Sequence, residues 1–349
     1  MIFTSDNWAG AHPAIAASLS AHSTGFAPAY GTSDLDRKVE QTFNEVFGQE
    51  VAVFFVGTGT AANSLALSAV NRPGGVSFCH REAHVIADEC GAPEFFSHGS
   101  RLVPVDGPEG KMNRATLEAE IARFPEGFVH AGQPMAITLT QATEAGTVYT
   151  ADEIRAIVAI ARAHGLPLHM DGARFANALV ALDLTPAQMT ADLGVDIVSF
   201  GGTKNGCWCA EALVFLNPDM ARQAPFIRKR AAHLFSKSRF IAAQFDAYFE
   251  NGLWLETARH ANAMSARLQA GITSSGNARL AWQSPANETF PIVSKALATE
   301  LAAKGAMFYE WSPPRSAAQL VGPEETMLRL VTSFATTQDH VDRFIDLVG

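Results

Sequence analysis

Positive charge and cysteine are both scarce in this sequence of 349 residues. Lys and Arg total 26 against 35 Asp and Glu, the net charge is −9, and no basic run is present. Because nucleic acids and anionic membranes are bound through clustered positive charge, neither is expected as a partner. The four cysteines are too few for a disulfide framework. Cys207 and Cys209 lack a second Cys/His pair, so no metal site is expected there.

Long hydrophobic runs are missing as well. No stretch is long enough to cross a bilayer, and residues 1–7 are neither basic nor followed by a long apolar segment. We therefore expect no secretory signal and a cytoplasmic protein. What the sequence does contain is 48% hydrophobic and 17% charged residues. That composition suits a globular chain, and the length favours one large domain with a smaller one.

The first two thirds of the chain alternate short apolar runs with helical patterns, which is typical of a parallel α/β sheet. The pair Thr150 and Glu153 has the spacing of a capping box and predicts a helix that ends at His164-Gly165. Strands are predicted at residues 51–55, 135–140, 167–170 and 195–200. After about residue 250 the pattern changes to a smaller mixture of helices and strands. We therefore predict a large α/β domain, residues 1–249, and a small C-terminal α+β domain, residues 250–349.

Four polar features follow predicted strands, namely Gly57–Thr60, Asp171, Arg174 and Lys204. In open α/β sheets ligands bind beyond the carboxyl ends of the strands, so these groups are expected to share one edge. A turn of this kind before a helix offers N–H groups to an anion. The hydroxyls of Thr58 and Thr60 favour a phosphate monoester. The same residues could also be a plain turn, or a degenerate dinucleotide fingerprint with Glu82 as the ribose acid.

Each of the other groups also has an ordinary structural explanation. Asp171 could cap a helix, His169 with Asp171 could suggest a metal but lacks a third ligand, and Lys204 could extend to solvent. Taken together, however, a phosphate cradle, a carboxylate and a lysine are the three contacts that pyridoxal phosphate requires. The carboxylate keeps the ring nitrogen protonated, and the lysine forms a Schiff base. A lysine partly removed from water is a suitable amine nucleophile.

At these positions the sequence resembles the threonine aldolases, within the aspartate-aminotransferase-like (fold type I) pyridoxal-phosphate enzymes. The resemblance runs through nearly the whole chain. It rests on Ser5-Asp6, Thr58-Gly59-Thr60-x-x-Asn63, Glu82-Ala83-His84 with Glu89, His169-Met170-Asp171-Gly172-Ala173-Arg174, Thr203-Lys204 and Arg329-Leu330-Val331-Thr332. The most specific part is the Asp-Gly-Ala-Arg block followed by the lysine.

The resemblance implies a role for each matching residue. The cofactor would be contacted by Thr58, Gly59, Thr60, His84 stacked on the ring, Asp171, Arg174, Lys204 and, from across a subunit boundary, Lys237 and Arg239. Ser5, Arg174 and Arg329 would hold the substrate carboxylate, since a guanidinium binds a carboxylate through two hydrogen bonds. The family builds its sites between subunits, so a homodimer or homotetramer is expected, with Tyr30 reaching a neighbour. Lys237 and Arg239 could equally be a solvated charge cluster.

The expected reaction is retro-aldol cleavage of L-threonine or L-allo-threonine to glycine and acetaldehyde. His84 and His130 are the candidates for the base that removes the β-hydroxyl proton, because histidine titrates near neutral pH. Departures from the common family pattern, such as Thr140–Glu144 and Asn205–Cys209, leave the preferred β-substituent open between methyl and aryl. β-Elimination and transamination on the same scaffold, and a nicotinamide-binding or non-catalytic protein, are the alternatives.

Overall fold

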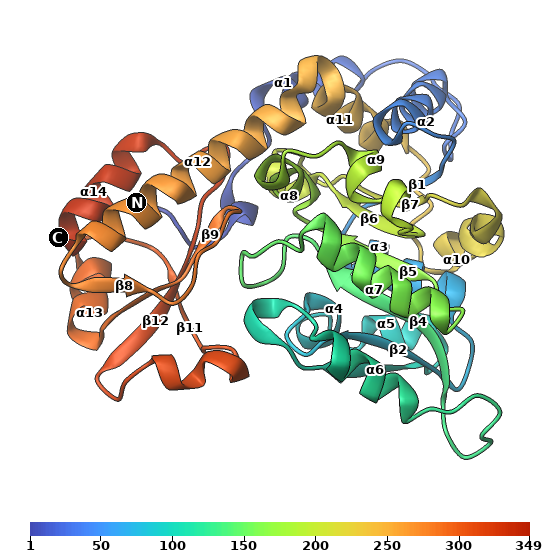
Figure 1. Cartoon of the computed structure of the whole chain (residues 1–349). Coiled ribbons are helices and arrows are strands. Elements are labelled where there is room, and N and C mark those ends of the chain that lie inside the picture. Colours follow the sequence, from blue (N-terminus) through green and yellow to red (C-terminus); the bar gives the residue numbers. More distant parts are fainter.

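The computed structural model describes residues 1–349 and contains a seven-stranded sheet in the order β1-β7-β6-β5-β4-β2-β3 (Figure 1). β7 pairs antiparallel with both β1 and β6, and the remaining pairs are parallel, so six strands point the same way. The strands are β1 (Ala52–Val56), β2 (Gly75–His80), β3 (Arg101–Val105), β4 (Gln133–Thr140), β5 (Leu168–Gly172), β6 (Ile197–Gly201) and β7 (Glu211–Phe215).

Helices cover both faces of this sheet, because alternate residues of its strands are apolar toward each side. In β6, for example, Val198 joins the larger core while Ile197 joins a smaller one. The larger core contains α2 (Asp34–Phe47), α7 (Ala151–Ala163), α8 (Phe175–Leu182) and α11 (Arg239–Phe249). The smaller core contains α3 (Gly59–Val70) and α10 (Ala224–Arg230). The other helices of this region are α1 (Pro13–Ala21), α4 (His84–Ala87), α5 (Ala92–Phe96), α6 (Arg114–Ala122) and α9 (Pro186–Met189).

A second, antiparallel sheet follows in the last hundred residues. Its order is β11-β12-β10-β8, and β9 pairs with the end of β12. The strands are β8 (Ala278–Leu280), β9 (Glu288–Thr289), β10 (Pro291–Ser294), β11 (Tyr309–Trp311) and β12 (Glu325–Val331), and the helices are α12 (Leu253–Ser274), α13 (Lys295–Ala303) and α14 (Gln338–Val348).

Helix α12 connects the two sheets. It runs from beside α11 to α14 (Figure 1). Trp254 and Ala258 at its start pack into the larger core, whereas Leu268 and Ile272 near its end pack into the core of the second sheet. The N-terminus also reaches that second core, because Phe3 is fully buried there and its backbone bonds Met307 and Val331.

The predicted α/β fold class is confirmed, and so are the capping box at Thr150 and Glu153 and the helix end at His164. The division into domains at about residue 250 stays a prediction. α12 begins there but contributes to both cores, and Phe3 packs with the C-terminal sheet although it was assigned to the large domain. No helix in the structure combines the length and the apolar character needed to span a membrane.

Candidate active site

The carboxyl ends of β1, β5 and β6 and the start of β7 surround a cavity of about 280 Å³. Only one of its thirteen lining residues is hydrophobic. The lining residues are Asn7, Gly57, Thr58, Gly59, Thr60, Asn63, His84, Glu89, Asp171, Ala173, Thr203, Lys204 and Glu211. The structure therefore brings together three of the four polar features predicted to share this edge, and the fourth, Arg174, follows the lining residue Ala173.

The N-terminus of α3 forms one wall of the cavity. Thr58 is the N-cap residue, and its Oγ1 accepts a hydrogen bond from the backbone N–H of Ala61 at 3.1 Å. The first N–H groups of a helix have no partner within the helix, and the helix dipole makes this end positive. Gly59 and Thr60 supply such groups at the cavity. This wall is therefore suited to an anion such as a phosphate.

Asp171 lines the cavity where β5 ends. Its side chain is 1% exposed although the residue lines the cavity. One carboxylate oxygen accepts the backbone N–H of Ala173 at 3.0 Å, and the other accepts the side-chain amide of Asn63 at 2.9 Å. Both contacts come from neutral donors, and no cationic side chain is paired with this carboxylate.

A chain of hydrogen bonds leads from Asp171 to His84. The Asn63 amide also donates to Glu89 Oε1 at 2.8 Å, and the same oxygen lies 3.0 Å from His84 Nδ1. The bond to Glu89 raises the pKa of His84, while burial raises the pKa of Glu89. Asn63 and Glu89 were noted in the sequence only as parts of a motif. Their positions show that they orient Asp171 and His84.

Lys204 lies on a single 3₁₀ turn, Thr203–Asn205, directly after β6. The residue that sequence reasoning missed here is Glu211, the first residue of β7. It is 6% exposed, lines the same cavity and accepts the backbone N–H of Thr203 at 3.3 Å. Burial raises its pKa to about 7. No local pattern predicted it, because an acid at the start of an apolar strand is normally read as a solvated end.

A group of buried ions, here called the junction cluster, lies where the two sheets meet. It consists of Asp6, Arg174, Glu288 and Arg329. Arg174 donates through Nε and Nη2 to Asp6 at 2.8 and 3.1 Å, and its Nη2 is 3.5 Å from Glu288. Arg329 donates through Nε to Glu288 at 2.9 Å and lies over the ring of Trp311. Each side chain in the cluster is at most 11% exposed.

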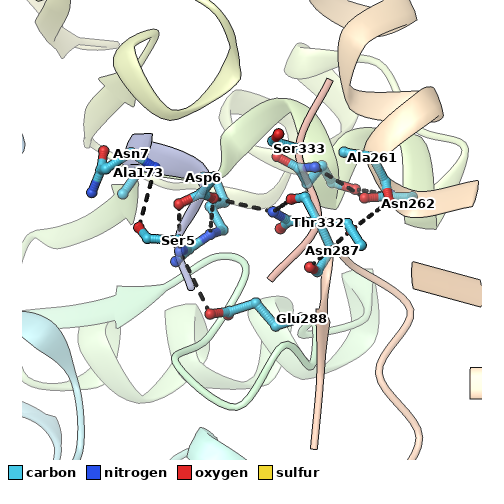
Figure 2. A network of polar contacts seen from close by, with 12 residues as sticks. Ser5, Asp6, Asn7, Ala173, Ala261, Asn262, Asn287, Glu288, Thr332 and Ser333 are labelled. Atoms are coloured by element: carbon cyan, nitrogen blue, oxygen red, sulfur yellow. Dashed lines mark hydrogen bonds and ion pairs between the residues drawn. The ribbon is translucent and has the colours of Figure 1, made fainter. Parts of the chain in front are cut away.

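The junction cluster ties the N-terminal segment to both sheets. Figure 2 shows Asp6 beside Asn287, with Glu288 close by, and the Asn287 amide donates to Asp6 at 3.1 Å and to the Thr332 carbonyl at 2.7 Å. Burial acts to raise the pKa of Asp6, but Arg174 and Lys204 outweigh it and lower that pKa. Glu144 is a further acid whose pKa is affected by these two cations. Its pKa is lowered because Arg174 and Lys204 overcome the effect of burial.

Ser5, predicted to hold the substrate carboxylate, begins the short helix that contains Asp6. Its hydroxyl accepts the backbone N–H of Asn7 at 3.1 Å, as an N-cap. The neighbouring Asn7 lines the cavity. The structure therefore places Ser5 next to the cavity but gives its hydroxyl a local structural partner.

Other predicted site residues do not reach this cavity within one chain. His130 is exposed in the loop before β4, which projects from the molecule in Figure 1. Since β4 and β5 are parallel, that loop lies at the edge opposite to Asp171. Lys237 is exposed, and Arg239 donates to the carbonyl of Gly25. Tyr30 is 51% exposed, and its ring lies under Lys229. None of these residues is among those that line the cavity.

The model of the family described as beta-eliminating lyase matches residues 3–294. The chain belongs to this family. A low-specificity L-threonine aldolase from Pseudomonas sp. (strain NCIMB 10558) is 40% identical over 307 residues, which is 88% of each chain, and one from Pseudomonas aeruginosa is equally similar.

Solved structures of related proteins agree with this assignment. The Leishmania major threonine aldolase superimposes with a TM-score of 0.91, at 30% identity, over 99% of this chain and 98% of that one. A serine palmitoyltransferase from Sphingomonas wittichii has a TM-score of 0.72 at 16% identity, covering 100% of this chain and 86% of that one. The second likeness shows the fold alone. The resemblance to threonine aldolases that was read from the sequence is confirmed.

Proposed function

We propose that the protein is a pyridoxal-phosphate-dependent carbon–carbon lyase that cleaves L-threonine, L-allo-threonine or related β-hydroxy-α-amino acids to glycine and an aldehyde. The observation that carries the proposal is the meeting of Lys204, Asp171 and the N-terminus of α3 around one polar cavity. The 40% identity to low-specificity L-threonine aldolases over 88% of the chain supports the substrate class.

The residues around the cavity fit the proposed cofactor. Asp171 is a nearly buried carboxylate whose hydrogen bonds come from neutral donors, which is the environment that holds a pyridinium nitrogen. Gly59 and Thr60 at the start of α3 suit the phosphate, and Lys204 suits the aldehyde. When bound, the cofactor withdraws electrons from a bond broken at the substrate's Cα. The contributions of the chain are to bind, to orient and to move protons.

His84 is proposed as the base for the β-hydroxyl proton. Its Nδ1 is directed at the carboxylate of Glu89, so Nδ1 carries the ring proton and Nε2 is left as the acceptor. His130 was the other candidate, and the structure does not bring it to this site. We therefore propose His84 rather than His130 as the base.

Arg174 and Arg329 are proposed to hold the substrate carboxylate. Each guanidinium uses Nε and Nη2 on a carboxylate of the junction cluster. Because arginine has five N–H donors, Nη1 of both residues remains for the substrate. The two residues come from different sheets, so a shared ligand would hold the sheets together. Ser5, beside Asp6, is proposed to contribute at the same place.

We also propose that the active protein is a homodimer or homotetramer in the cytoplasm. In such an assembly Lys237, Arg239 and Tyr30 would face the cavity of a neighbouring copy. The support is that Lys237 and Tyr30 are exposed and that none of the three residues lines the cavity of its own chain. Size-exclusion chromatography with light scattering tests the assembly, and a monomer that retains full activity would contradict it.

The experiment for the activity combines incubation of the purified protein with L-threonine and detection of acetaldehyde through alcohol dehydrogenase. Aldehyde release that disappears in Lys204→Ala supports the proposal. β-Elimination is the second candidate, because the family that matches the chain bears that name. It would produce a 2-oxo acid and ammonia, with no glycine. An aryl aldehyde from phenylserine, without acetaldehyde from threonine, would place the preference on aryl substituents.

A further inference from the structure

Glu211 is a cavity residue that the proposed reaction leaves without a role. In the antiparallel register of β6 and β7 it lies opposite Gly201, three residues before Lys204. Its carboxyl group is nearly buried, bonds the backbone of Thr203 and lines the same cavity as Lys204 and Asp171. Burial of an acid in an apolar strand is costly unless something compensates for it, so the presence of Glu211 in the cavity that Lys204 also lines needs a physical explanation.

The turn that carries Lys204 is held firmly. Gly202 donates its N–H to the carbonyl of Ala210, and Cys207 donates to the carbonyl of Gly202. Ala210, in turn, donates to the hydroxyl of Thr203 at 3.2 Å. A Cβ at Gly201 would come within 2.4 Å of the Ala173 carbonyl oxygen, so no other residue fits there. The distance between the Glu211 carboxyl and the lysine turn is thus fixed by backbone contacts.

The ionisable groups around Glu211 come from four elements. Lys204 on its turn acts to lower the pKa of Glu211, and Asp171 of β5 acts to raise it. Cys207 and Cys209 follow the lysine turn, and Tyr248 lies on α11. Burial raises the pKa of all three, so they are neutral near pH 7. Lys204 is therefore the only one of these neighbours that favours the ionised form of Glu211.

We propose that Glu211 is a positioning residue for Lys204, which fixes the lysine turn through Thr203 and sets the proton affinity of the lysine nitrogen by its own change of charge. The proposal rests on the proposed attachment of the cofactor at Lys204. Since burial places the pKa of Glu211 at about 7, the acid is neutral below that pH and negative above it. A negative charge on the wall of the cavity that Lys204 also lines favours the protonated form of the lysine nitrogen.

The first test is a pH titration of the visible absorbance of the cofactor-loaded protein, comparing the wild type with Glu211→Gln. The glutamine oxygen can still accept the N–H of Thr203, so only the charge is lost. The apparent pKa of the lysine–cofactor linkage should fall by about one unit in the variant, a tenfold change in proton affinity. Asp196→Asn is the matched control, because Asp196 precedes the opposite end of β6 and pairs with Arg162. A titration of Glu211→Gln that coincides with the wild type would overturn the proposal.

The second test needs neither the cofactor nor a variant of Glu211. The infrared band of a protonated carboxyl is followed against pH in cofactor-free wild type and Lys204→Ala. Loss of the lysine charge should move the midpoint of the buried acid to higher pH, because coupling between two groups is reciprocal. An unchanged midpoint would overturn the proposal even if Glu211→Gln failed to fold. A colourless protein with a shifted midpoint would instead remove the proposed function and keep the coupling.

Discussion

The cavity around Lys204 and the junction cluster around Arg174 are neighbours, yet their charges are arranged in opposite ways. In the cavity, Asp171 is held by the neutral donors Asn63 and Ala173. Lys204 affects the pKa of Glu211 through its charge but forms no ion pair with it. In the junction cluster, Arg174 is paired with Asp6 and with Glu288. The charged side chains of the cavity are thus free to contact a ligand. In the junction cluster, most of the charged groups are already paired with one another and hold chain segments together.

The difference indicates which substitutions should affect chemistry and which should affect folding. Removing a charge that is held by neutral donors leaves no unpaired opposite charge behind, so the structural cost is smaller than in an ion pair. Removing one member of a buried ion pair leaves the other without compensation, which is strongly destabilising. Substitutions in the cavity should therefore reduce turnover at nearly constant stability, whereas substitutions of the acids in the junction cluster should lower the stability of the fold.

The largest effect is expected for Asp171→Asn. An amide cannot keep the cofactor's ring nitrogen protonated, so turnover should fall on the order of 10³-fold while the unfolding temperature changes little. Steady-state kinetics and a thermal melt of the same preparation measure the two quantities. If the unfolding temperature instead fell sharply while the folded enzyme kept normal turnover, Asp171 would have a structural role like that of the junction cluster.

A loss of about 10²-fold or more is expected for His84→Asn, with the visible absorbance retained. The pKa of His84 is raised by its bond to Glu89, so the acid limb of the kcat/KM profile should move to lower pH in Glu89→Gln. A pH-rate profile of each variant measures this. Full turnover in His84→Asn would assign the base to another residue and direct attention to a neighbour's His130.

A loss of stability is expected for Asp6→Asn in the junction cluster, which should cost about 3 kcal/mol of unfolding free energy because Arg174 stays buried with only its 3.5 Å contact to Glu288. The pKa of Asp6 is lowered on folding, so its contribution is present above its ordinary value of 3.8 and is lost as pH falls through the folded value. Urea unfolding at pH 7 and pH 3 checks both points. Asp342→Asn, which breaks an exposed pair with Arg267, is the control. Equal stability of Asp6→Asn and that control would remove the distinction between the two regions.

The smallest effect is expected for Glu211, and its contribution to stability changes with pH in the opposite direction to that of Asp6. Its pKa rises on folding from 4.5 to about 7, so the folded state gains protons there and the wild type loses stability as pH rises between these values. Cofactor-free Glu211→Gln should lack this loss and should gain roughly 2 to 3 kcal/mol of stability relative to the wild type between pH 5 and pH 8, because each pKa unit corresponds to about 1.4 kcal/mol. Parallel curves for variant and wild type in urea unfolding would contradict it.

The sequence predicted the cavity better than the junction cluster, for a physical reason. Asp171 and Lys204 each follow a short apolar run, and parallel strands necessarily bring their carboxyl ends to one edge. Predicting the two strands was therefore sufficient to place Asp171 and Lys204 at the same edge of the sheet. For the small sheet, the sequence predicted only that helices and strands are present. It did not predict how the strands pair, because the register of antiparallel strands depends on contacts across the sheet.

The junction cluster depends on contacts that leave no local pattern. Asp6 and Arg174 are 168 residues apart, and Glu288 meets Arg329 because β9 pairs with the end of β12. Family resemblance named Arg174 and Arg329 for a substrate, but nothing in the spacing showed that Asp6 and Glu288 already bind them. Glu211 was missed for the same reason. Its hydrogen-bond partner Thr203 follows the end of β6, which pairs with β7 in an antiparallel register.

The central claim, that Lys204 carries pyridoxal phosphate for an aldol cleavage, is tested most directly by the visible spectrum of the purified protein before and after L-threonine is added, with acetaldehyde measured in the same cuvette. The account predicts a yellow protein whose band is lost in Lys204→Ala and whose wild type releases aldehyde. A protein that stays colourless after incubation with pyridoxal phosphate would contradict it.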